Sequence, residues 1–336
     1  MSNPLEYPSR LSLARTPTPF HALSRASERW GRGKRLWIKR DDLTGTLLTG
    51  NKVRKLEFIA AHAIENGYGT LVTCGGVQSN HCRATALVAA QLGLRCHLVL
   101  RDDGSAQRGT GNFLLDQIAG ASYEILPAAG WNTALQSAYR RLEQRFLELN
   151  QPALMIPTGG SDTLGIWGYI LASEELGRDV AAQQIQQAAV VLATGSAGTQ
   201  TGLTAGVAIA GLPLSVTGYA VCDNAEWFDS RVTSDWLASR RRWPQLPPVT
   251  VRPVTRDHSA GPAYGIAPPE VYQLIVELAR LEGVVLDPVY TGKAFYGLLK
   301  DIQDGYFDGV DDIIFIHTGG VFGLFAHDQP LTHAAS

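Results

Sequence analysis

The 336-residue chain has few cysteines, no surplus of either charge and no long apolar run. Its four cysteines, Cys74, Cys82, Cys96 and Cys222, show no C-x-x-C pair and no zinc spacing, so we expect buried thiols and no metal site. Lysine plus arginine (29) nearly balances aspartate plus glutamate (31), which favours neither nucleic acid nor a membrane surface as partner. No run is long enough to span a bilayer, and 1–6 does not resemble a signal peptide. We therefore expect a cytoplasmic protein.

Strand-like apolar runs alternate with helical segments along the chain. These runs lie at 36–39, 71–73, 96–100, 122–126, 189–193, 214–221, 284–286 and 313–317. Such alternation favours parallel sheets with helices on both faces, and the length suits two domains. We predict an α/β fold of two open, mostly parallel twisted sheets flanked by helices. A small α/β domain, 53–160, would be inserted in a large domain formed by 1–52 and 161–336.

Lys52 is the first candidate for chemistry. It follows a Gly-containing turn at 49–51 and opens an apolar helix predicted over 53–64. Arg54 and Lys55 follow within one helical turn, and nearby positive charges lower the pKa of a lysine towards the neutral amine. A positioned neutral amine is what Schiff-base chemistry on an aldehyde cofactor needs. A solvated basic face, common at helix starts, explains the same charges equally well.

A glycine-rich loop at 194–202 is a candidate anion site. It follows the predicted strand 189–193 and precedes a helix of small residues. Backbone N–H groups and the helix dipole at such a junction point towards a phosphate. The loop lacks the Gly-Lys-Ser/Thr ending of a mononucleotide loop and the glycine spacing of a dinucleotide loop. An ordinary strand-to-helix turn is the alternative.

A second polar loop precedes an alanine-rich helix at 84–92. It carries Gln78-Ser79-Asn80-His81 directly after the predicted strand 71–73 and two glycines. The free N–H groups of a helix start hold a carboxylate well, and Ser79 and Asn80 add a hydroxyl and an amide. A helix cap needs only one such residue, so four polar side chains in a row indicate a binding role beyond capping.

Five motifs together resemble one known family. They lie at 51–57, 78–81, 195–199, 286–293 and 315–320. In this order they resemble the D-cysteine desulfhydrase and 1-aminocyclopropane-1-carboxylate (ACC) deaminase family, from about residue 10 to residue 326. That family belongs to the pyridoxal-phosphate enzymes of the tryptophan synthase β-subunit-like fold, fold type II. The resemblance implies pyridoxal 5'-phosphate bound to the large domain, a small amino-acid substrate and a homodimer.

The resemblance also implies roles for individual residues. Lys52 would hold the cofactor aldehyde and later remove the Cα proton, and Asn80 would bind the oxygen of the ring 3-hydroxyl. The phosphate would bind, with Lys55 as counter-charge, to the loop formed by Thr194, Gly195, Ser196, Ala197, Gly198 and Thr199. The substrate would contact Ser79, Asn80, His81, Tyr264 and Tyr290, of which Ser79 and the two tyrosines also count as catalytic. A tyrosine can protonate or orient a leaving group, although a buried tyrosine that merely finds a partner fits the pattern too.

Two threonines distinguish activities within the family. ACC deaminases carry Glu after the second tyrosine and Leu before the last Gly-Gly, whereas this chain has Thr291 and Thr318 at these cofactor-contacting positions. A carboxylate beside the pyridine nitrogen favours its protonation and a strong electron sink, which opening of a cyclopropane needs more than β-elimination of a thiol. His81, where deaminases tend to have Gln, also favours β-elimination. Ala84 departs from the usual family Gln and leaves the substrate open.

The favoured activity is therefore β-elimination on D-cysteine, giving pyruvate, hydrogen sulfide and ammonia. A cysteate sulfo-lyase, with Arg83 meeting the sulfonate, and an ACC deaminase are alternatives on the same fold. A non-catalytic protein that binds or senses the cofactor is an alternative of another class. The arginine-rich segment 230–258, around Arg240, fits a surface loop better than a contact with a partner subunit.

Overall fold

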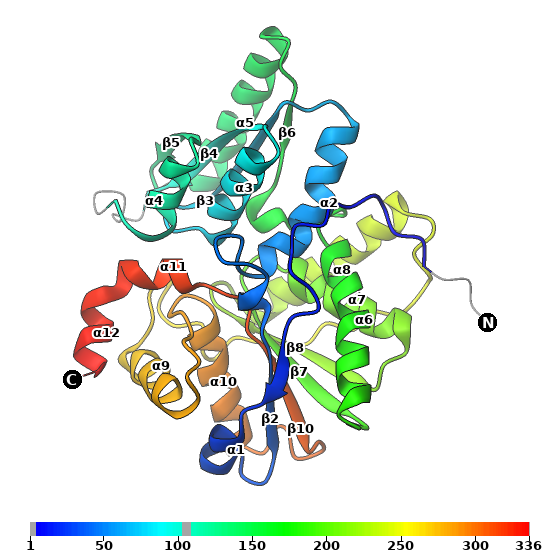
Figure 1. Cartoon of the computed structure of the whole chain (residues 1–336), viewed down its shortest axis with the longest axis vertical. Coiled ribbons are helices and arrows are strands. Elements are labelled where there is room, and N and C mark those ends of the chain that lie inside the picture. Colours follow the sequence, from blue (N-terminus) through cyan, green and yellow to red (C-terminus); the bar gives the residue numbers. More distant parts are fainter. Residues whose placement is uncertain (1–4, 103–108, 336) are drawn as a thin grey trace.

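The computed structural model describes residues 5–102 and 109–335, which form two lobes, each built on one sheet (Figure 1). The larger sheet contains, in spatial order, β1 (Phe20–Ala22), β2 (Arg35–Lys39), β10 (Asp312–Ile316), β7 (Ala188–Thr194), β8 (Leu214–Ala220) and β9 (Thr255–Arg256). The smaller sheet contains β5 (Ser122–Leu126), β4 (Arg95–Arg101), β3 (Thr70–Gly76) and β6 (Ala153–Met155). Of the strand pairs formed by the described residues in these two sheets, β1–β2 is antiparallel and the others are parallel. The predicted fold class is confirmed, and the domain boundaries stay a prediction.

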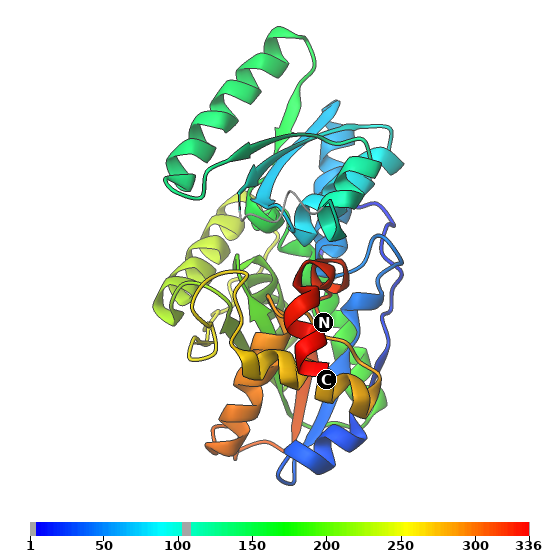
Figure 2. The ribbon, with the colours of Figure 1, turned by 90° about the vertical axis from the view of Figure 1, so that its left-hand side faces the viewer.

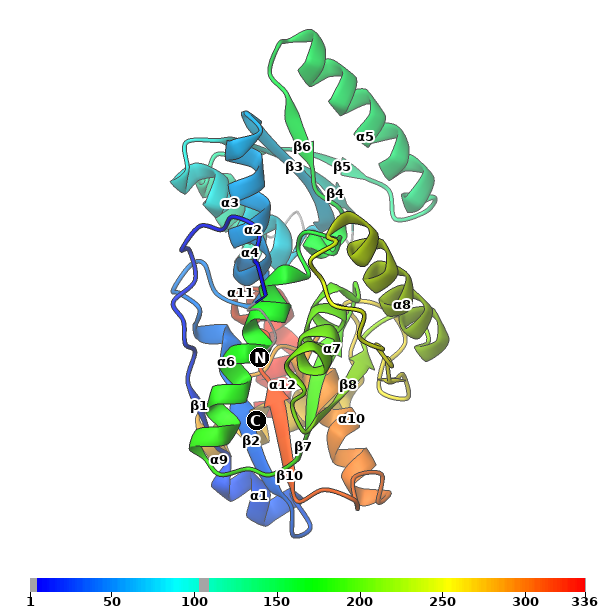
Figure 3. The same cartoon turned by 90° about the vertical axis from the view of Figure 1, so that its right-hand side faces the viewer.

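Helices cover both faces of each sheet. In the smaller lobe, α5 (Trp131–Glu148) covers one face, and the other is covered by α2 (Asn51–Glu65), α3 (Asn80–Gln91) and α4 (Gly111–Ile118) (Figures 2 and 3). In the larger lobe, one face is covered by α1 (Ser24–Trp30), α9 (Pro269–Glu282) and α10 (Thr291–Gln303), and the other by α6 (Trp167–Ala182) and α7 (Gly198–Ala210). The remaining helices are α8 (Ala225–Arg242), α11 (Val321–Leu324) and α12 (Asp328–Ala335), with short 3₁₀ turns η1 (Asp41–Leu43), η3 (Thr158–Gly160) and η4 (Phe325–His327). None of the helices in 5–102 and 109–335 is long and apolar enough to cross a membrane.

The central strand β7 shows why its sequence is apolar without interruption. Val191 packs with the layer of α9 and α10, whereas its neighbours Val190 and Leu192 pack with α6 and α7. Successive strand residues point to opposite faces, so a strand covered on both sides needs apolar residues at every position. The loop after β7 lies at the boundary between the lobes, where Gly195 and Ser196 line a cavity together with Gly76 and Ser79.

Two sequence-based assignments were wrong. The run 284–286 is not a strand: it follows the left-handed Gly283 that ends α9, and it is irregular although Val284 and Leu286 are buried. A short apolar run looks alike in a strand and in a buried loop, which explains the error. The segment 230–242, expected as a surface loop, belongs to helix α8. Its many charges lie on a helix whose residues Phe228, Val232 and Trp236 are buried.

A buried ion network fixes helix α2 to the larger lobe. The Arg54 guanidinium lies 2.7 Å from Asp41 on η1 and 3.0 Å from Glu175 on α6. Lys39 at the end of β2 also contacts Glu175, at 2.6 Å. Burial alone would raise the pKa of Glu175, but its hydrogen bonds to Arg54 and Lys39 and their charges lower that pKa to about 2. The network thus sets the position of α2, the helix that carries Lys52.

Replacing Arg54 by Met should lower the free energy of unfolding by about 3–5 kcal/mol, because Asp41 and Glu175 would keep buried charges without their partner. Urea unfolding followed by circular dichroism measures this loss. Arg10→Met is the control, since Arg10 pairs with Glu57 at 3.4 Å while its side chain is 46% exposed. We expect that variant to lose at most about 1 kcal/mol. Equal losses in both variants would contradict a structural role of the buried network.

Candidate active site

Two of the sequence motifs meet where helix α2 begins. Asn51 N donates to Thr318 O at 3.0 Å, so the turn before Lys52 lies against the loop after β10. Gly50 has φ +97°, and a Cβ there would stand 2.8 Å from Thr318 O. A Cβ on Gly319 would in turn stand 2.8 Å from the Cα of Gly50. Only glycine allows this approach, and the contact places Lys52 at the boundary between the lobes.

Burial, and not neighbouring charge, adjusts the Lys52 amine. Burial lowers the pKa of Lys52 to about 8. The expected repulsion from Arg54 does not operate, because Asp41 and Glu175 neutralise that guanidinium on the far side of the helix. The pKa of Lys55 lies well below its ordinary value, through burial first and the charge of Lys52 second. At a pH near 8 a large fraction of Lys52 is therefore the neutral amine that an aldehyde requires.

Lys55 lies against the loop 194–199 where helix α7 begins. The Lys55 ammonium is fully buried and donates to Gly159 O at 3.2 Å and to Ser161 Oγ at 3.0 Å. A Cβ on Gly198 would stand 2.8 Å from Lys55 Nζ, so the ammonium lies at the first residue of α7. No carboxylate among the described residues forms an ion pair with it. A buried lysine without a counter-charge at a helix N-terminus favours an anionic ligand, which would stabilise its charged form.

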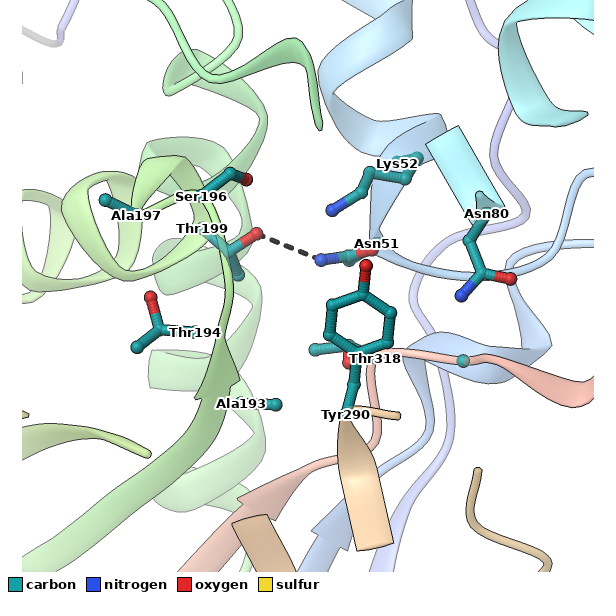
Figure 4. A pocket seen from close by; sticks show the side chains of 11 residues that line it. Asn51, Lys52, Asn80, Ala193, Thr194, Ser196, Ala197, Thr199, Tyr290 and Thr318 are labelled. Atoms are coloured by element: carbon teal, nitrogen blue, oxygen red, sulfur yellow. Dashed lines mark hydrogen bonds between the residues drawn. The ribbon is translucent and has the colours of Figure 1, made fainter. Parts of the chain in front are cut away.

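Thr194 provides a further sign of a ligand. Its Oγ1 is buried and has no hydrogen-bond partner among the described residues, although Thr194 lines the cavity beside Lys52. Across that cavity, Asn51 Nδ2 donates to Thr199 Oγ1 at 3.0 Å (Figure 4). Buried hydroxyls normally find a partner, so an unpaired one facing a cavity indicates a bound polar group. Helix N–H groups, a buried lysine and a free hydroxyl near an amine together fit a phosphorylated aldehyde.

Two cavities that share Lys52, Ser196 and Tyr290 hold most of the predicted site residues. The first is lined, among others, by Lys52, Asn80, Thr194, Ser196, Ala197, Thr199, Tyr290 and Thr318. The second, of about 560 Å³, is lined by Lys52, Ser79, His81, Gly195, Ser196, Tyr264, Tyr290 and residues of both lobes. Lys55, Gly198 and Thr291 line neither cavity. The first cavity, of only about 20 Å³, has the hydroxyl and amide lining expected around the polar groups of a cofactor, and the second has the volume to hold a small ligand beside it.

Ser79 both caps a helix and faces the second cavity. Its Oγ accepts from Cys82 N at 3.2 Å at the start of α3, as an N-cap does. The next residue, Asn80, accepts from Asn112 Nδ2 through Oδ1 at 3.0 Å, which orients the Asn80 amide at the first cavity. The free N–H groups of α3 thus point towards the space beside Lys52.

His81 is a neutral hydrogen-bond acceptor. Thr73 Oγ1 lies 2.9 Å from His81 Nε2 and 3.1 Å from Ile156 O, and when the hydroxyl donates to Ile156 O the ring proton lies on Nε2. Burial, then the charges of Lys52 and Lys55, hold the pKa of His81 well below its ordinary value. The buried Nδ1 has no partner among the described residues. It therefore offers an unpaired acceptor at the second cavity.

Tyr264 and Tyr290 form a phenol pair. Their hydroxyl oxygens lie 2.5 Å apart and their rings meet edge to face at 5.8 Å. Burial raises the pKa of Tyr264 to about 12 and that of Tyr290 well above its ordinary value, so both keep their protons at neutral pH. One proton lies between the two oxygens. The other is free to be donated to a group in the cavity.

The two discriminating threonines differ in position. Thr318 lines the first cavity. Thr291 is fully buried, and its Oγ1 donates to Asp287 Oδ1 at 2.8 Å and accepts from Asp287 N at 2.9 Å. Asp287 also accepts from the backbone N–H of Tyr290 at 2.9 Å and so caps α10. Thr291 thus supports the turn that carries Tyr290.

Arg83 does not reach the substrate cavity. Its guanidinium donates to Thr49 O at 2.6 Å and lies 5.2 Å from the ring of Phe322, while its side chain is fully buried. The suggestion that Arg83 meets a sulfonate is therefore wrong. Position in the sequence next to the 78–81 motif was misleading, since the side chain of Arg83 lies on another face of α3.

Sequence reasoning missed Asn51, Ser161, Arg101 and Lys293. Lys293, in the first turn of α10, is buried and donates to Val221 O, Ala260 O and Ala263 O at 3.2, 2.6 and 2.9 Å. It thereby holds the loop before Tyr264 against the helix that begins after Tyr290. Both Asn51 and Lys293 lie within motifs already singled out, 51–57 and 286–293, but neither was assigned a role there.

The fold and the site define an enzyme that uses pyridoxal phosphate, and the comparisons agree. Residues 11–319 match the family described as "Pyridoxal-phosphate dependent enzyme". A bifunctional D-cysteine desulfhydrase/1-aminocyclopropane-1-carboxylate deaminase, mitochondrial, of Arabidopsis thaliana is 36% identical over 330 residues, 94% of this chain and 79% of the relative. A D-cysteine desulfhydrase of Yersinia pestis (strain Pestoides F) is 38% identical over 323 residues, 95% of this chain and 96% of the relative.

A solved structure extends the match to three dimensions. The crystal structure of an ACC deaminase homologue superposes with a TM-score of 0.87 at 34% identity, over 97% of this chain and 96% of that one. The chain belongs to the D-cysteine desulfhydrase/ACC deaminase family of pyridoxal-phosphate dependent enzymes. The predicted family and cofactor are thus confirmed.

The pKa of Lys52 predicts how the enzyme takes up its cofactor. Only the neutral amine attacks an aldehyde, so the rate of pyridoxal phosphate incorporation into apoenzyme should rise with pH and level off above about pH 8. Stopped-flow absorbance between about pH 6 and about pH 10 measures this rate. A rate that still rises tenfold per unit beyond pH 9 would contradict a pKa lowered by burial. Lys52→Ala, which has no amine, is the control and should show no such phase.

Proposed function

We propose that this enzyme is a carbon–sulfur lyase that converts D-cysteine to pyruvate, hydrogen sulfide and ammonia by β-elimination. The observation that supports it is the composition of the cofactor cavity. Among the described residues that line this cavity, only Lys52 and Tyr290 can ionise, and none is a carboxylate. Thr318 supplies a hydroxyl, and Asp287 is occupied with capping α10.

A cofactor cavity lined without a carboxylate suits a reaction whose leaving group departs readily. Bound pyridoxal phosphate supplies the electron sink for loss of the Cα proton. A carboxylate at the pyridine nitrogen would enforce the protonated, stronger sink. Opening an unactivated cyclopropane requires that sink, whereas expulsion of a thiol requires less. The cavity lining therefore favours β-elimination over ring opening.

Lys52 is the base of the proposed reaction. Lys52 lines both cavities, so the same side chain would serve cofactor and substrate. With a pKa near 8, the amine accepts a proton from Cα at neutral to mildly basic pH without being trapped in its charged form. The substrate carboxylate would bind at the start of α3, on Ser79 and the N–H groups behind it.

The phenol pair supplies the proton for the leaving group. Tyr264 and Tyr290 line the same cavity as Lys52 and share one hydrogen bond, which leaves one hydroxyl proton for the substrate. Their raised pKa values keep that proton in place until a negatively charged sulfur develops beside it. His81 adds an acceptor, not a positive charge. Because a base, a proton donor and an acceptor line one cavity, catalysis is a better proposal than cofactor binding alone.

ACC deamination is the second candidate, because the name of the Arabidopsis relative includes both activities. The decisive test assays D-cysteine, L-cysteine, cysteate and ACC in parallel. We expect sulfide and pyruvate from D-cysteine, and a loss of roughly a thousandfold or more in Lys52→Ala. Release of 2-oxobutyrate from ACC at a higher kcat/KM than D-cysteine turnover would contradict the proposal. Turnover of none of the four would leave the non-catalytic alternative.

A further inference from the structure

One arginine in the substrate cavity has no role in the chemistry above. Arg101 is the last residue of β4, at the carboxyl end of the smaller sheet, and lines the cavity with Lys52, Ser79 and Tyr290. Its guanidinium carbon lies 5.0 Å from the ring centroid of Tyr264, which belongs to the larger lobe. On its own lobe it lies 6.0 Å from the ring centroid of Trp131. Arg101 thus extends from one lobe to the phenol pair of the other.

Arg101 is a cation without a carboxylate partner in the part of the chain that the structure describes. The other arginine of the cavity, Arg231, pairs with Asp235 at 2.9 Å and is neutralised. Asp223 lines the same cavity, but no ion pair joins it to Arg101. A guanidinium stacked on aromatic rings keeps its donors free at the edges. Among the described residues, Arg101 is therefore the guanidinium of this cavity without an ion pair, and it lies beside the ring of Tyr264.

We propose that Arg101 is the specificity residue that binds a negatively charged group on the substrate Cβ and stabilises the sulfur anion as it departs. This inference rests on the proposed elimination.

In that elimination, the Cα–H bond breaks and its proton goes to Lys52 Nζ, while its electron pair forms the Cα=Cβ bond. The Cβ–S bond breaks and leaves its pair on sulfur, and water then converts the released enamine to pyruvate and ammonia. The substrate class is amino acids with an anionic sulfur group on Cβ, thiolate or sulfonate.

The charge of the leaving group explains why the cavity needs a cation in addition to the two phenols. The phenol pair can donate one proton, which serves a thiolate but cannot neutralise a sulfonate that leaves as sulfite. A guanidinium offers several donors in one plane and matches the oxygens of such a group. Because Arg101 comes from the smaller lobe and the tyrosines from the larger, a bound anion would be held from both sides.

Binding of two isosteric amino acids tests the charge recognition directly. D-aspartate carries a carboxylate on Cβ and D-asparagine a neutral amide, and neither can undergo β-elimination. Their Kd values are measured on the holoenzyme from the change in cofactor absorbance, together with those of the L-enantiomers. The wild type should bind aspartate more tightly, and Arg101→Gln should weaken aspartate binding by roughly 10- to 100-fold. Asparagine binding should change by less than about threefold, which also shows that the variant is folded.

A second measurement examines the departing group. Chloride leaves readily without help, so kcat/KM for β-chloro-D-alanine should fall little in Arg101→Gln, while kcat/KM for D-cysteine falls roughly tenfold or more. Arg101→Lys keeps the charge and should restore most of the aspartate affinity. Equal losses with both substrates, or with aspartate and asparagine, would overturn the proposal and reduce Arg101 to a structural stack on Tyr264. Failure of the wild type to use D-cysteine would refute the proposed function, while the aspartate and asparagine comparison would still decide the role of Arg101.

Discussion

The site depends on the close approach of two glycine turns. Gly50 and Gly319 pack so tightly that a Cβ on either would stand 2.8 Å from backbone atoms of the other turn. This contact joins the first residue of α2 to the loop after β10, and the network of Arg54 fixes the next turn of the same helix. Lys52 lies between these two anchors. Because the backbone is fixed on both sides of Lys52, its side chain approaches a cofactor in one orientation. Catalysis by proton transfer requires such positioning.

Buried polar groups that the protein does not fully satisfy indicate what the site is built to hold. Lys55 is buried without an ion pair among the described residues, and Thr194 Oγ1 and His81 Nδ1 lack hydrogen-bond partners there. Isolated groups of this kind cost stability in a folded protein. They are tolerated at functional sites, where a ligand completes them. Cofactor binding should therefore contribute to the stability of the fold as well as to its chemistry.

The sequence was sufficient for the fold class and for most of the elements around the site. Strands such as β7 and loops such as 194–199 carry local patterns that follow from burial on two faces and from helix starts. The properties that the sequence could not predict depend on contacts between residues that are distant in the chain. The pKa of Lys52 is lowered by burial, which no local pattern encodes, and Arg54 is neutralised by Glu175. Arg83 and Arg101 were equally visible as arginines, and only the packing of α3 and β4 separates a buried side chain from one that faces the cavity.

Lys52 is the residue that we expect to carry the cofactor. Reducing the holoenzyme with borohydride fixes pyridoxal phosphate to the amine that holds it, and peptide mass mapping then locates the modified lysine. We expect the modification on the peptide that contains Lys52, in a single copy per chain. Lys55 and Lys293, both buried nearby with carbonyl or hydroxyl partners, should stay unmodified. Modification at either of these lysines, or at none, would contradict the site described above.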